Sequence, residues 1–525
     1  MSNAPNDLLF DTPVDAPAHS PQPAAKKRRN GKVKNIILDR QQLCWAPIDL
    51  EHLIDADHPA RAIADMLQRI DMTPFEEDIQ TREQQVGRPC WPVRELIAVW
   101  SYAYSMGVSS AREIERRMVY EPGLRWLVAD RQINHHTLAD FRVQQEQALE
   151  GLFVQILAVL EQEGMVDLQT VMHDGTKIEA VASTQSYHRR GTLEKHLERA
   201  QEAVRQLQSE SQANDEVGDK RRASARQRAA REKLERMEAA LEKMKELEEE
   251  SAESRKAGLR VSESEAEARK MKGNDGGWGL NYNAQLSTEA SHKVIVGVGL
   301  STESNDLHQL EAAVEQVEDN CGKAPQQMVV DNGYATRENV EMMSEKQVEL
   351  IAPWKEDSSR EAGACAVNGI AKELASSQFR ENGEGEGLSC KAGKELEKTG
   401  ERKHHGVLRV IYQAKAEDCA ECEWKVDCCG KKEGPRQVER VQESEAMKQY
   451  LERMKQPEAR EVYKRRAEVA EFPNLWIKSV LGIRRFRVRG PTKAGMELTW
   501  AAIAYNIAQW RRVRWEVKDA GKKAA

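Results

Sequence analysis

The stretch TVMHDGTKIEA, residues 170–180, carries the first of three acidic residues on which the fold and the chemistry of this chain depend. A mainly apolar run at 168–172 leads towards Asp174, and a second run at 328–330 ends on Asp331, within QQMVVDNGYA. Short apolar runs that end on an acid are typical of buried strands whose last residue projects into a crevice. We therefore expect two strands of a mixed sheet to carry one carboxylate each to the same rim.

The third acid comes from RRAEVAEFPNLWIKSV, residues 465–480, near the C-terminus. We interpret Glu471 as this acid and keep Glu468 as its competitor. Pro473 is awkward inside a helix, so we expect a helix to start or kink there, with Glu471 in its first turn. Hard divalent cations take several oxygen ligands, and a lone aspartate cannot hold two ions about 3.5–4 Å apart. An isolated aspartate after an apolar run is usually a turn residue, whereas two aspartates and a glutamate together indicate metal-dependent phosphodiester chemistry.

The composition is that of a large chain with room for two to four domains, since its 525 residues are 40% hydrophobic. We find neither an apolar run of about 18 residues nor a signal peptide, which argues against secretion and membrane insertion. Of the nine cysteines, four lie within 419–429, which favours a reducing, cytoplasmic compartment over a disulfide framework. The net charge of −7 argues mildly against DNA binding, but basic residues gather at 26–34 and 464–514, so a separate basic surface remains compatible with a nucleic-acid partner.

Helical periodicity dominates residues 36–165. A segment opened by Pro92 and closed by Gly107 is followed by two more helix starts, which we place at Ser110 and Thr137 because both have capping-box spacing. Short helices around turns are typical of a helix-turn-helix module, in which Arg142 would face DNA. An exposed arginine that only aids solubility is an equal alternative.

The segment 190–270 is strongly charged, with apolar residues spaced by threes and fours, which predicts an antiparallel helical hairpin with its tip at 211–219. Its narrow apolar seam can pair the two arms with each other or with another subunit. Strand and helix patterns then alternate: a hairpin, a helix, the Asp331 strand, a helix and a last strand, at 281–302, 307–319, 328–330, 336–345 and 348–352. This order is compatible with a ribonuclease-H-like core.

Four cysteines offer thiolates to a tetrahedral structural zinc ion: Cys390, Cys419, Cys422 and Cys428. Ordinary reduced cysteines in a loop are the alternative, because no second CxxC completes the usual pairing. Substitute ligands are Cys429, His404 and His405. The surrounding insert (355–455) is poor in apolar residues, so we expect it to build little core and a metal cross-link to compensate.

Taken together, these motifs resemble those of bacterial insertion-sequence transposases of the DDE type. The resemblance covers most of residues 36–510 and rests on SSAREIERRM (109–118), HHTLADFR (135–142), HDGTKIEA (173–180), NYNAQ (281–285), DNGYATRENV (331–340), the cysteine cluster and RRFRVRG (484–490). It implies an α/β catalytic core, a ribonuclease-H-like mixed sheet flanked by helices, together with an all-α N-terminal domain, a helical-hairpin insert and a cysteine-rich insert.

In such transposases the first acid lies in a D-G-T-K-like motif, which Asp174 matches, and the second lies in D-x-G-Y, which Asp331 matches. The third is a glutamate that follows Y-x2-R and precedes a lysine, a pattern matched here by Tyr463, Arg466, Glu471 and Lys478. The Arg-to-Glu spacing is one residue longer than in the best-known form, so Glu468 stays as the competitor.

The resemblance also implies roles for these residues. The three acids would bind two Mg²⁺ or Mn²⁺ ions, and the DNA phosphates would be held by Arg466, Lys478, Arg142, Arg485 and Arg489. The implied enzyme binds the terminal repeats of its own element, cleaves at their ends and transfers the 3′-ends to target DNA. It would work as a homodimer or larger synaptic assembly, in the bacterial cytoplasm and at the nucleoid, without a membrane. The alternatives are a catalytically inactive, domesticated transposase that only binds DNA, and a nuclease that hydrolyses without joining.

These expectations divide the chain into seven parts. They are a disordered basic arm (1–35), a helical DNA-binding domain (36–165), and the first part of the core (166–354) with a hairpin insert within it (190–270). The cysteine-rich insert (355–455), the C-terminal helices that complete the core (456–515) and a tail (516–525) follow.

Overall fold

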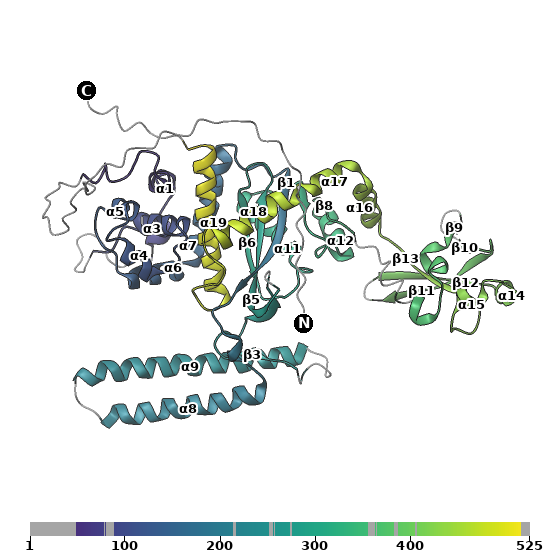
Figure 1. Cartoon of the computed structure of the whole chain (residues 1–525), viewed down its shortest axis with the longest axis horizontal. Helices are drawn as coiled ribbons and strands as arrows, with labels where there is room; N and C mark the ends of the chain where they lie inside the picture. The colour runs from purple at the N-terminus through teal and green to yellow at the C-terminus, as the bar shows by residue number, and fades with distance from the viewer. Residues whose placement is uncertain are drawn as a thin grey trace, which may run out of the picture. The chain divides into compact units, whose positions relative to one another are not determined.

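The computed structural model describes residues 49–77, 79, 89–213, 217–250, 256, 258–273, 276–354, 363, 365–382, 387–404 and 407–515. The expected basic arm (1–35) and tail (516–525) lie outside the described residues. Within those ranges, no helix combines the length and the apolarity that crossing a bilayer requires. The described elements form a helical N-terminal region, a mixed sheet with its helices, a long helical hairpin and a second, antiparallel sheet (Figure 1).

The N-terminal region is helical, as its periodicity predicts. Pro92 caps α3 and sets its extended entry, and that helix is buried along most of its length. The helices are α1 (Pro59–Leu67), α2 (Thr73–Glu76), α3 (Val93–Ser105), α4 (Ala111–Arg117), α5 (Pro122–Leu127), α6 (His135–Gln144) and α7 (Glu146–Gln162).

Two expected helix starts differ in detail from the structure. Ser110 precedes α4 as expected, but its side chain makes no capping hydrogen bond, and Glu113 pairs with Arg116 instead. The helix expected to start at Thr137 begins two residues earlier, because the Asn134 side chain caps α6 by accepting from a backbone N–H of the first turn.

The mixed sheet has the neighbour order β6-β5-β1-β7-β8, and β4 also pairs with β5. β1 runs antiparallel to β5 and parallel to β7, and β7 is parallel to β8. Two helices connect these strands, α11 (Leu310–Cys321) and α12 (Arg337–Glu345). The strands are β1 (Thr170–Glu179), β4 (Arg269–Lys272), β5 (Trp278–Glu289), β6 (Ile295–Ser301), β7 (Gln327–Val329) and β8 (Glu349–Ile351).

The first acid does not end its strand, contrary to expectation. β1 has 10 residues and continues through Asp174 to Glu179, because β5 pairs with it along this whole stretch. Asp331, by contrast, follows β7 by two residues, as the short apolar run predicts.

The C-terminal helices are α16 (Glu445–Lys455), α17 (Pro457–Lys464), α18 (Arg466–Ser479) and α19 (Pro491–Val513). α18 lies against β1 and β5 and contains Pro473 in its interior, so Glu471 sits mid-helix rather than in a first turn. α19 packs against α3, α7 and β6, and thereby joins the N-terminal helices to the sheet (Figure 1). The Asn506 side chain fixes this contact, because it bonds both the N–H and the C=O of Ile295.

The helical hairpin consists of α8 (Arg190–Ala213) and α9 (Val217–Glu250), which lie side by side (Figure 1). The apolar seam thus pairs the two arms with each other, and the middle of the expected tip, 214–216, lies outside the described residues. At its root, η1 (Thr184–Ser186) leads into β2 (Tyr187–His188), which pairs with β3 (Val261–Ser262) where the chain returns.

The cysteine-rich insert is more ordered than its composition predicts. It folds as an antiparallel sheet in the order β13-β12-β11-β10-β9, with a core of its own built around Leu388, Leu396, Val410, Tyr412 and Val438. The elements are β9 (Arg380–Asn382), β10 (Gly387–Ser389), β11 (Glu395–His404), β12 (Val407–Ala414), β13 (Gln437–Val441), η2 (Lys372–Leu374), η3 (Ser376–Gln378), α14 (Ala416–Ala420) and α15 (Lys425–Cys429). The insert ends before α16, which packs against α12.

Candidate active site

Asp174 and Asp331 lie on neighbouring parallel strands. β1 and β7 pair at Met172 and Val329, and continuing this register by two residues brings Asp174 level with Asp331. Strand pairing alone therefore brings together two carboxylates that are far apart in the sequence.

α18 supplies the direct partners of Asp174. The Arg466 guanidinium donates to Asp174 Oδ1 at 2.6 Å, and the Asn474 amide donates to Oδ2 at 2.9 Å. Burial raises the pKa of the Asp174 carboxyl from 3.8 to about 6, although Arg466 opposes the shift. Three nearby acids raise it further: Asp331, Asp306 and Glu471.

The two glutamates of α18 face different surroundings. The negative charge of Glu471 contributes to the raised pKa of Asp174, so the Glu471 side chain lies within electrostatic reach of the aspartates. Both glutamates are exposed, and the Glu468 carboxylate accepts from Lys293 Nζ at 2.8 Å. The electrostatic effect on Asp174 thus distinguishes Glu471 from Glu468, which pairs with Lys293.

A fourth acid that the sequence did not single out, Asp306, belongs to the same site. It lies in the loop after β6, and its Oδ1 accepts from the side chains of Asn283 and Gln285 at 2.6 and 2.9 Å. Lys177 Nζ lies 3.4 Å from the same oxygen. Asn283 and Gln285 of the NYNAQ motif therefore hold the Asp306 carboxylate in place.

The glycines of the two aspartate motifs leave room for these carboxylates. A Cβ on Gly175 would lie 2.7 Å from Asp306 Oδ1 and 2.6 Å from Gln285 Nε2. A Cβ on Gly333 would lie 2.9 Å from Asp331 Oδ1, the oxygen that accepts from the Gly333 N–H at 2.7 Å. Both glycines are thus required by close approach to an acid.

His173 supports the site from inside the sheet and is not a candidate ligand. Its Nδ1 lies 2.9 Å from Ser287 Oγ and its Nε2 lies 2.8 Å from Gln285 Oε1, which also accepts from the Tyr334 hydroxyl at 2.6 Å. Burial lowers the pKa of His173 to about 4, so the ring is neutral at pH 7.

Lys478 lies on the side of α18 that faces β1, as Arg466 and Asn474 do. Its Nζ donates to Thr176 Oγ1 at 2.5 Å, beside Asp174, and burial lowers its pKa to about 8. Two lysines, Lys177 and Lys478, and one arginine, Arg466, thus surround the acids, an arrangement suited to a phosphate that approaches the carboxylates.

Two transposase families match the chain. The family described as Transposase domain (DUF772) matches residues 48–144, in the helical N-terminal region. The family described as Transposase DDE domain matches residues 389–511, which include α18 and most of α19. The chain belongs to the DDE-type insertion-sequence transposases. No curated protein and no solved structure matches it.

Arg142 does not lie on the surface of the transposase, contrary to the expectation that it contacts DNA. It is only 7% exposed and donates to the Ser109 carbonyl at 2.7 Å. Its guanidinium lies over the Trp100 ring and 3.7 Å from Glu497, whose side chain is 1% exposed. The alternative of an exposed arginine that only aids solubility is equally wrong, because this cation is buried and neutralises a buried acid.

The other two expected DNA contacts are exposed arginines. Arg485 donates to the backbone carbonyls of Ala180 and Val181 and so attaches the RRFRVRG segment to the end of β1. Arg489 is exposed.

The cysteines of the second sheet converge in part. Cys428 is buried, its thiol pKa is raised to about 11, chiefly by burial, and its thiol neighbours are Cys429, Cys419 and Cys390. Backbone N–H groups point at the sulfurs of Cys390 and Cys419, at 3.3 and 3.5 Å. Cys422 lies in the turn after α14, and His405 is outside the described residues. Cys429 is therefore as well placed as Cys422 to act as a fourth thiolate.

The possible metal ligands are spaced differently at the acid site around Asp174 and at a second group of side chains. Among the described residues, one group of three has its ligand atoms within 4.8 Å of one another, namely His188, His196 and Glu263. The acids around Asp174 do not form such a group among the described residues.

Proposed function

We propose that this transposase binds the terminal repeats of its element, cleaves at their ends and transfers the 3′-ends to target DNA by two-metal-ion phosphodiester chemistry. The observation that carries the proposal is the convergence on Asp174 of segments almost 300 residues apart, with Asp331 beside it and α18 across it. The strand order β6-β5-β1-β7-β8, with three antiparallel and then two parallel strands, supports a ribonuclease-H-like core.

The donor set fits hard divalent cations such as Mg²⁺ or Mn²⁺. Asp174, Asp331 and Glu471 offer carboxylate oxygens, which are the ligands that such ions prefer. Asn474 Oδ1 is buried beside Asp174 and has no hydrogen-bond partner among the described residues, so it adds an oxygen that a cation can satisfy. Two bound ions would activate the attacking water or 3′-hydroxyl and stabilise the departing 3′-oxygen.

The residues of the chain itself prepare this site. Arg466 neutralises Asp174 through the 2.6 Å ion pair and, once the acids have another counter-charge, is free to hold a phosphate oxygen. Lys478 holds a second phosphate position next to Thr176. Asp306 keeps Lys177, Asn283 and Gln285 in place, because its Oδ1 accepts from all three side chains.

The thiols of Cys390, Cys419 and Cys428, with Cys422 or Cys429, would hold a structural Zn²⁺ in the second sheet. The backbone N–H groups directed at two of the sulfurs support this assignment, since such bonds stabilise thiolate ligands. The absence of stoichiometric zinc from the purified, reduced protein would refute this zinc site.

The test is Mn²⁺-dependent cleavage and joining of labelled element-end DNA, with DNA affinity measured in parallel. Asp174→Ala, Asp331→Ala and Glu471→Ala should abolish chemistry and keep binding. Glu468→Ala is the matched control, because it removes the same side chain one turn away on the same helix and should stay active. If wild type binds the element ends but never cuts them, the chain is an inactive transposase that only binds DNA. If it cleaves without joining, the chain is a nuclease.

A further inference from the structure

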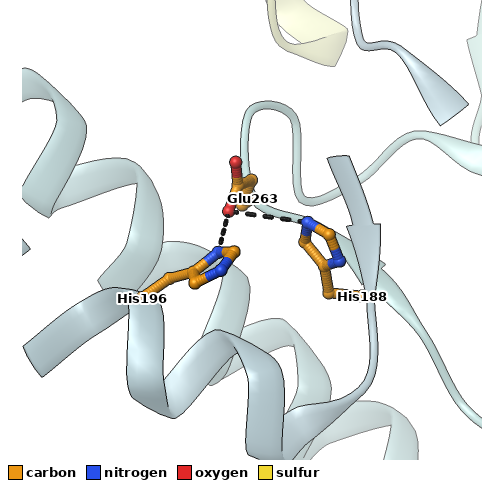
Figure 2. A group of neighbouring side chains, drawn as sticks. All are labelled: His188, His196 and Glu263. Carbon is orange, nitrogen blue, oxygen red and sulfur yellow. Dashed lines mark hydrogen bonds and ion pairs between the residues drawn. The ribbon is translucent and has the colours of Figure 1, made fainter. Parts of the chain in front are cut away.

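Three metal-ligand side chains meet at the root of the helical hairpin (Figure 2). His188 ends β2, His196 lies in the second turn of α8, and Glu263 follows β3. They come from the point where the chain leaves for the hairpin, from the hairpin itself and from the point where the chain returns.

Both imidazoles point at the same carboxylate oxygen (Figure 2). His196 Nδ1 lies 2.6 Å from Glu263 Oε2, and His188 Nε2 lies 3.7 Å from it. The second distance is too long for a hydrogen bond. The two rings stand nearly perpendicular, at 81°, with centroids 5.1 Å apart. Two imidazole nitrogens thus converge on one carboxylate oxygen.

We propose that His188, His196 and Glu263 form a binding site for a divalent transition-metal ion of the zinc class. Zn²⁺ binds imidazole nitrogen and carboxylate oxygen at about 2.0–2.2 Å, and two histidines with one glutamate are an established donor set for it. Tetrahedral bonds of that length put ligand atoms roughly 3.3–3.5 Å apart. The three atoms already lie within 4.8 Å of one another, so small side-chain rotations would complete the geometry.

A plain histidine–carboxylate pair does not account for the second imidazole. Elsewhere His135 Nδ1 lies 2.6 Å from Glu115 and His52 Nδ1 lies 2.7 Å from Asp49, each with a single imidazole on the carboxylate. Only at Glu263 does another ring approach the same oxygen without bonding it, among the pairs that the described residues form. Each of the three side chains is also 24–29% exposed, which leaves an entry path for the ion and room for a water as the fourth ligand.

Such an ion would clamp the hairpin. The cluster beneath the root is small, with five buried residues, Leu193, Ala240, Met244, Val261 and Ala266. A core of that size stabilises its surroundings weakly, whereas metal binding adds directly to the free energy of folding. The nitrogen-rich donor set also separates this site from the acid site, because imidazole selects zinc-class ions and carboxylates select Mg²⁺ or Mn²⁺.

Cobalt substitution in the full-length, chelator-stripped protein tests the donor set. Co²⁺ at this site should give visible ligand-field bands without the thiolate-to-metal charge transfer that cobalt at the cysteines would show. His196→Asn and Glu263→Gln should weaken this cobalt binding at least roughly 100-fold, more than loss of an outer partner does. His52→Asn is the matched control and should bind as wild type does. Equal cobalt content and spectra in all four proteins would overturn the proposal.

Hydrogen exchange of wild type alone keeps the test independent of how the variants fold. Adding Zn²⁺ to the stripped protein should slow exchange in peptides that cover 184–198 and 259–266, while Mg²⁺ should leave them unchanged. Protection confined to the cysteine-rich sheet, or equal protection by both ions, would overturn the proposal of a site selective for zinc-class ions.

Discussion

Replacing Gly175 by alanine should destabilise the transposase more than the addition of one methyl group suggests. The added Cβ would lie 2.6 Å from Gln285 Nε2, 2.7 Å from Asp306 Oδ1 and 3.0 Å from the Tyr334 hydroxyl oxygen. None of the three can withdraw alone, because Gln285 donates to Asp306 at 2.9 Å and accepts from Tyr334 at 2.6 Å. Relief of the clash therefore breaks at least one of these hydrogen bonds.

The expected loss has two parts. Forcing a methyl group into a packed region destabilises by about 1–3 kcal/mol, and losing a hydrogen bond to a charged group by about 1.5–3 kcal/mol. We therefore expect Gly175→Ala to lower the free energy of unfolding by about 2.5–6 kcal/mol, and strand transfer to fall with it because Asp306 moves.

Gly151→Ala is the matched control for this measurement. Gly151 lies inside α7, and a Cβ there meets nothing within 4 Å, so alanine should stabilise the helix by about 1 kcal/mol. Urea unfolding of both variants and wild type, followed by circular dichroism, compares the opposite signs. A Gly175→Ala variant as stable as wild type would refute the account of why the D-G-T-K motif carries glycine.

Three further outcomes follow from charges and burial. The pKa of Asp174 is raised to about 6 in the folded state, so the stability contributed by its protonated form is present at pH 4 and lost as the pH rises through 6. In metal-free urea titrations, the stability of Asp174→Asn relative to wild type should therefore increase by up to about 3 kcal/mol between pH 4 and 7. A stability difference that stays constant with pH would contradict the raised pKa. Arg142→Ala leaves Glu497 buried without its cation and should lower stability by about 3–5 kcal/mol, read by thermal unfolding, whereas normal stability with weakened DNA affinity would mean that Arg142 reaches phosphate. The pKa of Lys478 is lowered to about 8 by burial, so strand transfer should decline above pH 8 in wild type and hold to higher pH in Lys478→Arg; parallel profiles would remove Lys478 from phosphate binding.

The features that the sequence predicted well are those set by periodicity and strand pairing. The apolar runs before Asp174 and Asp331, the hairpin at 281–302 and the seam of the helical hairpin all report burial along one element. Because parallel neighbours share a register, two such runs were enough to expect that the aspartates lie together.

The missed features depend on contacts between elements. Asp306 lies in the polar loop STESNDLHQL, where nothing local separates it from a turn residue. A usable signal was present in its partners, since Asn283 and Gln285 alternate along a buried strand opposite Gly175. Arg142 could not be placed from its helix, because Trp100 and Glu497 reach it from other parts of the chain.

The second sheet was missed for a different reason. Its overall composition is polar, which led to the expectation of little core, yet VLRVIYQA (407–414) alternates in period two and buries Val410, Tyr412 and Ala414 on one face. A short window would have detected this strand, whereas the average over 355–455 concealed it.

The position of α19 constrains how the transposase is made. α3 and α7 emerge from the ribosome well before the helix that covers them, because α19 ends only at Val513. At about 5–20 residues per second, the first helices wait roughly 20–80 s for their packing partner, with apolar surface open to chaperones and proteases. A premature stop codon anywhere upstream of α19 therefore yields a product whose N-terminal helices lack their packing partner.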